Sequence, residues 1–270
     1  MLHPEPDFKQ TVLSYYHNHG RRDLPWRQPD GTGFDPYKIM VSELMLQQTQ
    51  VGRVIPKYSA FLKTFPTVAD LAAAPLKDVL VAWSGLGYSR RAKYLQQAAQ
   101  LIVSEYDSQF PSEVSQLIKL PGIGTNTAGA IMAYAFNAPV LFIETNIRTV
   151  FIHHFFAEQV GVADSSVLAK VAATLDHDQP REWYWALMDY GTFLKQTVGN
   201  TAQRSAGYVR QAQFIGSRRQ IRGEVIRLLA TTPHTLAQLQ AQIPDERLDL
   251  VLADLVAEKM IASGPGGFRL

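Results

Sequence analysis

The stretch Leu120-Pro121-Gly122-Ile123-Gly124 constrains the fold of this 270-residue chain more than any other segment. Pro121 restricts φ, and the two glycines permit backbone angles and close approaches that a Cβ atom would prevent. We therefore expect a tight turn, because neither a helix nor a strand tolerates this combination internally. The small residues from Thr125 to Ala135 predict a helix after the turn. Its first N–H groups, at the positive end of the helix dipole, suit a phosphate.

The pattern of the chain up to about residue 200 predicts an all-α body. Apolar residues recur at helical spacing between glycine and proline joints, and no sustained strand alternation occurs there. Pro56 is expected to open a helix at its first turn, and Thr67 is expected to cap a helix in a reciprocal box with Asp70. Trp26 and Trp83 are assigned to the core. Residues 195–217 are polar and weakly periodic, so they are interpreted as a loop or linker. The helices expected before this segment include residues 147–158, 165–175 and 181–193.

The last fifty residues predict a small separate domain. Three helices are expected at 221–229, 235–243 and 247–259. A strand at 260–263, a turn at 264–267 and a strand at 268–270 follow. Three helices with a terminal hairpin are typical of a winged helix.

Composition narrows the class of protein. A hydrophobic content of 46% and a mean hydropathy of −0.09 are those of an ordinary soluble protein. No apolar run approaches the roughly 20 residues that span a bilayer, and the N-terminus lacks a signal-peptide pattern, so we expect a cytoplasmic protein without a membrane partner. The sequence has no cysteine, which excludes disulfides and Cys-ligated iron–sulfur clusters. With a net charge of only +2, any nucleic-acid surface must concentrate its positive charge locally.

Two glutamates are candidates for acid–base chemistry. Glu43 lies in the helical stretch SELMLQQTQV, and Glu144 follows an apolar run and precedes Asn146 by two residues. A pair of carboxyl groups suits a reaction in which one donates a proton and the other stabilises a cation. The alternatives are a solvated helix residue for Glu43 and a helix N-terminal residue for Glu144.

Several motifs together resemble the helix–hairpin–helix DNA glycosylases, and most closely the MutY-type adenine DNA glycosylases. In chain order they are Leu24-Pro25-Trp26-Arg27, Ser42 to Val51, Phe65-Pro66-Thr67-Val68, Gly85-Leu86-Gly87-Tyr88, Leu120 to Gly124, Thr127-Ala128-Gly129-Ala130 and Met188-Asp189-Tyr190-Gly191. The resemblance implies an all-α core of two helical subdomains with the active site in the cleft. The expected boundaries are 1–200 for this core (30–140 with the hairpin; 1–29 and 141–200 as the second subdomain), 201–217 for a linker and 218–270 for the winged-helix-like domain.

The resemblance also implies the reaction. The chain would act as a monomer on double-stranded DNA with a mispaired or damaged base, and would hydrolyse the N-glycosidic bond of adenine opposite guanine or 8-oxoguanine. Glu43 occupies the position of the proton donor, and Asn146 that of the amide that holds water and carboxylate. Glu144 stands where the family has an aspartate. The extra methylene displaces the carboxylate, and a displacement of a catalytic group near 1 Å can lower the rate about 10²-fold. The glutamate therefore indicates either a weaker activity or a different substrate.

DNA-contacting residues are implied in the same way. Gln48 and Tyr88 correspond to side chains that fill the gap left by a flipped nucleotide, although Tyr88 could equally be a core aromatic. Arg90 and Arg91 offer a basic patch, which is more often a solvated helix face. The turn residues expected to grip phosphate are Leu120, Gly122, Gly124, Thr125 and Asn126, and main-chain carbonyls of this turn often hold a monovalent cation in the family.

One residue separates the two branches of the family, and the region after residue 191 departs from many relatives. Asn126 replaces the lysine nucleophile of the lyase branch, so a monofunctional enzyme is expected. The four cysteines that bind a [4Fe–4S] cluster in many relatives are absent, so we expect no cofactor and no metal held by side chains. Only about fifty residues follow Gly216, so a Nudix-like recognition domain is not expected. A glycosylase for another base and a non-catalytic DNA-binding protein that reads DNA through its winged helix therefore stay open as alternatives.

Overall fold

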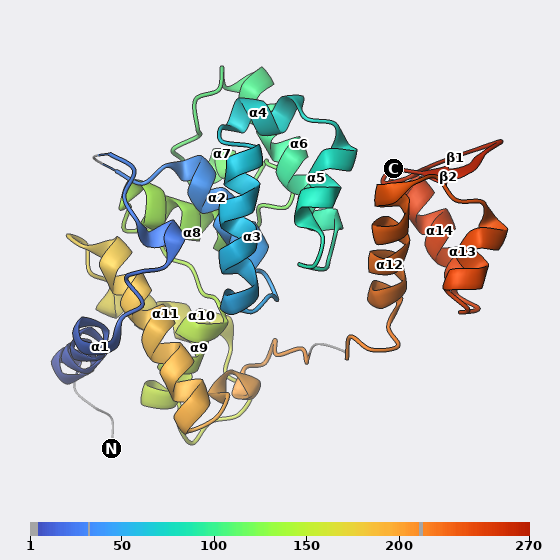
Figure 1. Ribbon diagram of the computed structural model, residues 1–270. Coiled ribbons are helices and arrows are strands. Elements are labelled where there is room, and N and C mark those ends of the chain that lie inside the picture. Colours follow the sequence, from blue (N-terminus) through green and yellow to red (C-terminus); the bar gives the residue numbers. More distant parts are fainter. Residues whose placement is uncertain (1–4, 32, 211–212) are drawn as a thin grey trace. The chain divides into compact units, whose positions relative to one another are not determined.

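The computed structural model describes residues 5–31, 33–210 and 213–270, and these residues form helices joined by short loops and one small sheet (Figure 1). The expected all-α body is confirmed. Its elements are α1 (Glu5–His19), η1 (Pro25–Arg27), α2 (Pro36–Leu46), α3 (Val51–Thr64), α4 (Val68–Ala73), α5 (Leu76–Trp83), α6 (Arg90–Glu105), α7 (Val114–Leu117), α8 (Thr125–Phe136), α9 (Thr145–Phe155), α10 (Asp164–Thr174), α11 (Pro180–Thr197) and η2 (Thr201–Arg204). None of the described helices is long and apolar enough to cross a membrane.

The chain divides into two compact units. Unit 1 comprises Met1–Glu43, Ser112–Lys119 and Ile123–Arg210, and unit 2 comprises Leu44–Pro111, Leu120–Gly122 and Gln211–Leu270. The domain boundaries drawn from the sequence stay a prediction, and the expected linker includes residues 211–212, which lie outside the described residues.

Unit 1 is built around helices α9 and α11, which pack along each other and against α1 and α8. The ring of Phe8 on α1 lies between aromatic side chains of these helices, with centroid distances of 5.3 Å to Phe151 and 5.9 Å to Trp183. Large buried aromatic contacts of this kind dominate core energetics. The result is a fixed packing of α9 on α11, and these two helices carry most of the site described below.

Unit 2 combines helices α3 to α6 with the C-terminal domain. Trp83 is buried at the end of α5, as expected, and Trp26 is buried in unit 1. Thr67 and Asp70 form the reciprocal capping box that the sequence predicts for α4. The C-terminal domain contains α12 (Arg218–Thr231), α13 (Leu236–Gln242), α14 (Leu248–Ala257), β1 (Ala262–Gly264) and β2 (Gly267–Arg269), shown in orange to red in Figure 1. The assignment of this domain as a winged helix stays a prediction.

Three local expectations need correction. The hairpin begins at Ala262 rather than at residue 260, because the main-chain N–H groups of Met260 and Ile261 bond to Leu255 O and close α14. Pro56 lies inside α3 rather than at its start. A proline ring inside a helix crowds the carbonyl of the residue four positions earlier. Here that residue is Gly52, which has no side chain to add to the crowding.

The third correction concerns the segment interpreted as a loop or linker from residue 195. Helix α11 continues to Thr197, because Leu194 is buried and its carbonyl accepts the Val198 N–H at 2.8 Å. Lys195 is therefore a helical residue with a fixed direction.

Candidate active site

Glu43 lies near the end of α2 and is half-buried. Burial of the carboxyl and, to a smaller extent, the negative charge of Glu144 raise its pKa from 4.5 to about 8, although the positive charge of Arg27 acts in the opposite direction. Desolvation and a like charge both favour the neutral acid. Glu43 therefore holds a proton at neutral pH and can donate it.

Glu144 caps helix α9. Its side-chain Oε1 accepts the main-chain N–H of Asn146 at 2.9 Å, and its backbone is extended, with φ −124° and ψ −179°. Glu144 is thus a helix N-terminal residue, as the alternative interpretation stated, and this position does not exclude a catalytic role. A carboxyl oxygen at this place satisfies a main-chain N–H group that the helix itself leaves without a partner. The structure brings Glu43, Glu144 and Asn146 together in unit 1.

Asn126 ties the start of α8 to the segment before Glu144. Its side-chain Oδ1 accepts the N–H of Ile143 at 3.2 Å. This contact fixes the chain immediately before the candidate carboxylate. The side chain is exposed, so a contact with DNA as well stays a prediction.

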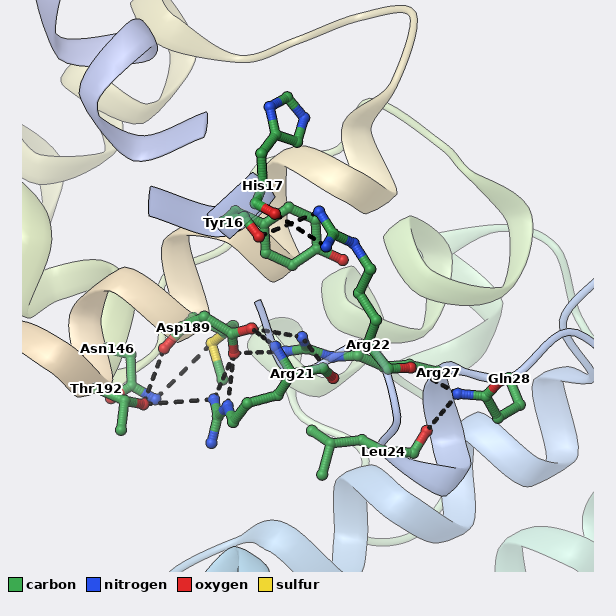
Figure 2. A network of polar contacts seen from close by, with 11 residues as sticks. Tyr16, His17, Arg21, Arg22, Leu24, Arg27, Gln28, Asn146, Asp189 and Thr192 are labelled. Carbon is green, nitrogen blue, oxygen red and sulfur yellow. Dashed lines mark hydrogen bonds and ion pairs between the residues drawn. The ribbon is translucent and has the colours of Figure 1, made fainter. Parts of the chain in front are cut away.

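A buried ion network lies next to these carboxylates. Arg27 donates to both oxygens of Asp189 at 2.8 and 2.9 Å, and the Arg21 guanidinium donates to the same carboxylate at 2.5 and 2.8 Å, as Figure 2 shows. Burial alone would raise the pKa of Asp189, but the hydrogen bonds and charges of the two arginines outweigh it and lower the pKa. Within this network, the positive charge of Arg27 opposes the rise of the Glu43 pKa.

Tyr134 is a site residue that the sequence did not reveal. It is buried on α8, and burial raises its pKa, with further contributions from the charges of Glu43 and Glu144. Its ring stacks on Trp185 at a centroid distance of 5.9 Å. The only signal in the sequence was an aromatic residue within a run of small ones. The influence of both carboxyl groups on its pKa places Tyr134 near them.

Lys195 is the second residue that sequence analysis missed. Its Nζ donates to Asn146 Oδ1 at 2.7 Å, from the last turn of α11. Burial lowers the pKa of Lys195, and the charge of Glu144 partly offsets this effect. Lys195 therefore adds an ammonium group to the pair of Glu144 and Asn146, and the three residues form a triad.

The predicted turn between α7 and α8 is present. Gly122 has φ +77°, and a Cβ there would lie 2.9 Å from the Cβ of Tyr94, so both the backbone angle and the space require glycine. Gly122, Gly124 and Thr125 are exposed and present main-chain groups to solvent. Leu120, in contrast, is 3% exposed, so its side chain belongs to the core rather than to a DNA-contacting surface.

The two predicted wedge residues share an unusual backbone. Gln48 has φ +55° and Tyr88 has φ +48°. Non-glycine residues in this region cost roughly 1–3 kcal/mol and cluster at functional sites. A cavity of about 490 Å³ lies beside both side chains and is lined by residues that include Arg90 and Arg218. Tyr88 is half-buried, and Arg219 of α12 donates to its hydroxyl and lies over its ring at 4.8 Å.

The two candidate arginines differ. Arg91 is buried and donates to the carbonyls of Leu44 at 2.5 Å and Gln47 at 2.7 Å, so it braces the loop that carries Gln48. Arg90 is exposed and pairs with Glu258 of the C-terminal domain, which also binds Arg222. Direct contact of either arginine with DNA stays a prediction.

The expectation that side chains hold no metal ion stays a prediction. Across the part of the chain that the structure describes, no three or more His, Cys, Asp or Glu side chains are grouped so as to hold a metal ion. The rings of the adjacent residues His153 and His154 lie 4.9 Å apart in an edge contact, and His154 Nε2 lies 3.1 Å from the hydroxyl of Tyr190. The absence of a cofactor stays a prediction.

Comparison with known proteins gives consistent matches. Residues 41–170 match the model of the HhH-GPD superfamily of base excision DNA repair proteins. The chain is 39% identical over 273 residues to an adenine DNA glycosylase of Mycolicibacterium smegmatis, covering 92% of each chain. It is 33% identical over 287 residues to the adenine DNA glycosylase of Mycobacterium tuberculosis, covering 96% of this chain and 93% of the relative. It is 35% identical to the human adenine DNA glycosylase over 68% of this chain and 35% of that protein.

Solved structures agree on the fold. A thermostable thymine-DNA glycosylase superposes with a TM-score of 0.61 and 24% identity, covering 69% of this chain and 85% of that one. Endonuclease III in a non-covalent DNA complex superposes with a TM-score of 0.56 and 16% identity, covering 72% of this chain and 86% of the other. The helical glycosylase fold predicted from the sequence is thereby confirmed.

Proposed function

Because the chain belongs to the HhH-GPD superfamily of base excision DNA repair proteins, we propose that it is an adenine DNA glycosylase, an enzyme that hydrolyses the bond between adenine and deoxyribose in DNA. Relatives named for this activity match almost the whole chain. The single observation that carries the proposal is the raised pKa of Glu43 in unit 1, next to a second carboxyl group, the helix cap Glu144. A DNA-binding protein without catalysis has no use for such a pair.

The two carboxyl groups divide the reaction between them. Glu43 donates its proton to a ring nitrogen of adenine, which makes the base a better leaving group. The C1′–N9 bond then breaks, and its electron pair leaves with adenine. The sugar becomes cationic, and the carboxylate of Glu144 stabilises this charge as it develops.

Water completes the reaction. A water molecule adds to C1′ and returns a proton to the Glu43 carboxylate, which now acts as a base. Asn146 orients this water and the Glu144 carboxylate through hydrogen bonds. The products are free adenine and an abasic site. The reaction stops there, because the amide of Asn126 cannot form the Schiff base that breaks the strand.

The same proposal covers DNA binding. The exposed N–H groups of the turn at Gly122 and Gly124 bind backbone phosphate, and its carbonyls accept a monovalent cation. Gln48 and Tyr88 fill the gap in the duplex after the adenine nucleotide has flipped out. Their strained backbone angles support this role. The proposed substrate is adenine opposite guanine or 8-oxoguanine. The absence of an iron–sulfur cluster, the monomeric state and the cytoplasmic location are part of the same proposal.

The presence of Glu144 favours a second candidate substrate. If the site has re-formed around the longer side chain, the enzyme releases a different damaged or mispaired base. Base release from duplexes that carry adenine opposite guanine, 8-oxoguanine, cytosine or thymine, and from a panel of damaged bases, decides between the two. Glu43→Gln is the matched control, since it keeps the size of the side chain and removes the proton. Release that is unaffected by this variant would refute the proposed chemistry.

A further inference from the structure

Helix α11 presents one face to Asn146. Met188, Gly191 and Lys195 are spaced by three and four residues and so share that face. A Cβ at Gly191 would lie 2.5 Å from the main-chain oxygen of Asn146, so only glycine allows this approach of α11 to the start of α9. The close approach places the ammonium of Lys195 beside the Asn146 side chain at 2.7 Å.

The chemistry of this contact fixes the direction of the amide. An ammonium group has three donors and no acceptor, so the atom of Asn146 that faces it has to be the oxygen. The Nδ2 group then points away from Lys195, where its nearest partner is the weak acceptor Met188 Sδ at 3.9 Å. Without the lysine, rotation of the amide by half a turn would exchange its donor and acceptor ends.

The contact continues to the candidate carboxylate. The main-chain N–H of Asn146 donates to Glu144 Oε1 at 2.9 Å, and the charges of Lys195 and Glu144 attract each other. Ammonium, amide and carboxylate thus form one chain of interactions in unit 1, in the order Lys195, Asn146, Glu144. Networks of this kind act as a unit, and their members are not independent.

We propose that Lys195 is a positioning residue of the glycosylase reaction, which fixes the amide of Asn146 with its donor end free for water and places a positive charge beside Glu144. This inference rests on the proposed function. Lys195 does not touch the reacting atoms in this role. It acts through Asn146, and that dependence can be measured.

The test is a double-mutant cycle on single-turnover base release. Lys195→Met should slow release by about 10- to 100-fold, the range expected for the loss of one hydrogen bond to a charged group. Affinity for a duplex with an uncleavable adenine analogue should change by less than about threefold, because the effect is on orientation. Lys195→Arg keeps the charge and the donor and should recover most of the rate. Lys170→Met removes another half-buried lysine of unit 1, whose ammonium lies over the Phe155 ring, and should leave the rate unchanged.

The Asn146→Ala background separates a positioning role from a merely structural one. If Lys195 acts through the amide, Lys195→Met should slow Asn146→Ala by less than about threefold. An equal loss in both backgrounds, or a Lys195→Met rate equal to the parent rate, would overturn the inference. A second measurement does not depend on activity. The side-chain amide signals of Asn146 in nitrogen–proton spectra should shift in Lys195→Met and not in Lys170→Met.

The two measurements keep the two proposals apart. If the parent protein releases no adenine, the proposed function fails, and the amide signals still decide whether Lys195 holds Asn146. Unshifted signals would refute the contact itself. If adenine is released and the cycle shows no coupling, the role of Lys195 alone is refuted.

Discussion

Glu43→Gln should stabilise the folded protein at alkaline pH while it abolishes base release. The folded state raises the pKa of Glu43 from 4.5 to about 8. Between these values the folded protein binds a proton that the unfolded chain has already released, so this group lowers the free energy of unfolding as the pH rises. This loss in the free energy of unfolding is absent below about pH 4.5 and complete above about pH 8. A glutamine at this position carries no charge and avoids it.

The pKa shift of Glu43 sets an upper limit to the free energy of unfolding that Glu43→Gln can gain at alkaline pH. At about 1.36 kcal/mol per pKa unit, a rise from 4.5 to about 8 corresponds to at most about 5 kcal/mol. The measured gain should be smaller, about 1–3 kcal/mol, because Glu43 keeps some access to solvent and the amide must also be desolvated.

Urea denaturation at about pH 5 and about pH 9 measures the effect. Tryptophan fluorescence is a suitable signal for unit 1, which contains Trp26, Trp183 and Trp185. Glu158→Gln, which replaces an exposed carboxyl of unit 1, is the matched control at both pH values. The reasoning is wrong if Glu43→Gln changes the free energy of unfolding by the same amount at both pH values. In the parent, single-turnover release should fall as the pH rises through about 8, because the proton donor is lost.

Three further outcomes are expected. Glu144→Gln should abolish release and leave binding of an uncleavable substrate nearly unchanged, since the amide oxygen can still cap α9 but cannot offset the cationic sugar; full activity would place the second carboxylate elsewhere. Borohydride should trap no covalent adduct at a yield that matches turnover, because Asn126 is not a nucleophile; stoichiometric trapping would contradict this. We expect Arg219 to leave the Tyr88 hydroxyl and contact a phosphate when DNA binds. Arg219→Ala should then weaken duplex binding and lower the dependence of log affinity on log salt concentration by about one unit. An unchanged dependence would limit the role of Arg219 to holding Tyr88.

Local rules explain what the sequence predicted correctly. The turn at Gly122 was predictable because only glycine satisfies both its positive φ and the closeness of Tyr94. The capping box at Thr67 and Asp70 depends on residues three apart, and it formed as expected. The burial of Trp83 follows from its size and its place at the end of an apolar helix.

Long-range contacts explain what the sequence did not predict. Lys195 lies 49 residues from Asn146, and nothing near it in sequence marks it as a partner. The polar residues around it suggested a loop, whereas burial of Leu194 extends α11 by packing. Tyr134 was hidden for a similar reason, because the charges that perturb its pKa come from two other elements.

The glutamate at position 144 is best understood together with Lys195. Its carboxylate reaches the N–H of Asn146 at 2.9 Å and so lies at the positive end of α9, the place where a shorter aspartate would also cap the helix. The longer side chain has one more rotatable bond to immobilise, which costs conformational entropy. The ammonium of Lys195, held on Asn146 at 2.7 Å, attracts the carboxylate and offsets part of that cost. We therefore expect that Glu144→Asp alone does not produce a fully active aspartate site. Lys195 would still hold the Asn146 amide in the position that suits the glutamate, whose carboxylate lies about one carbon–carbon bond farther from the backbone. Any loss of rate in Glu144→Asp should for this reason be smaller in a Lys195→Met background than in the parent.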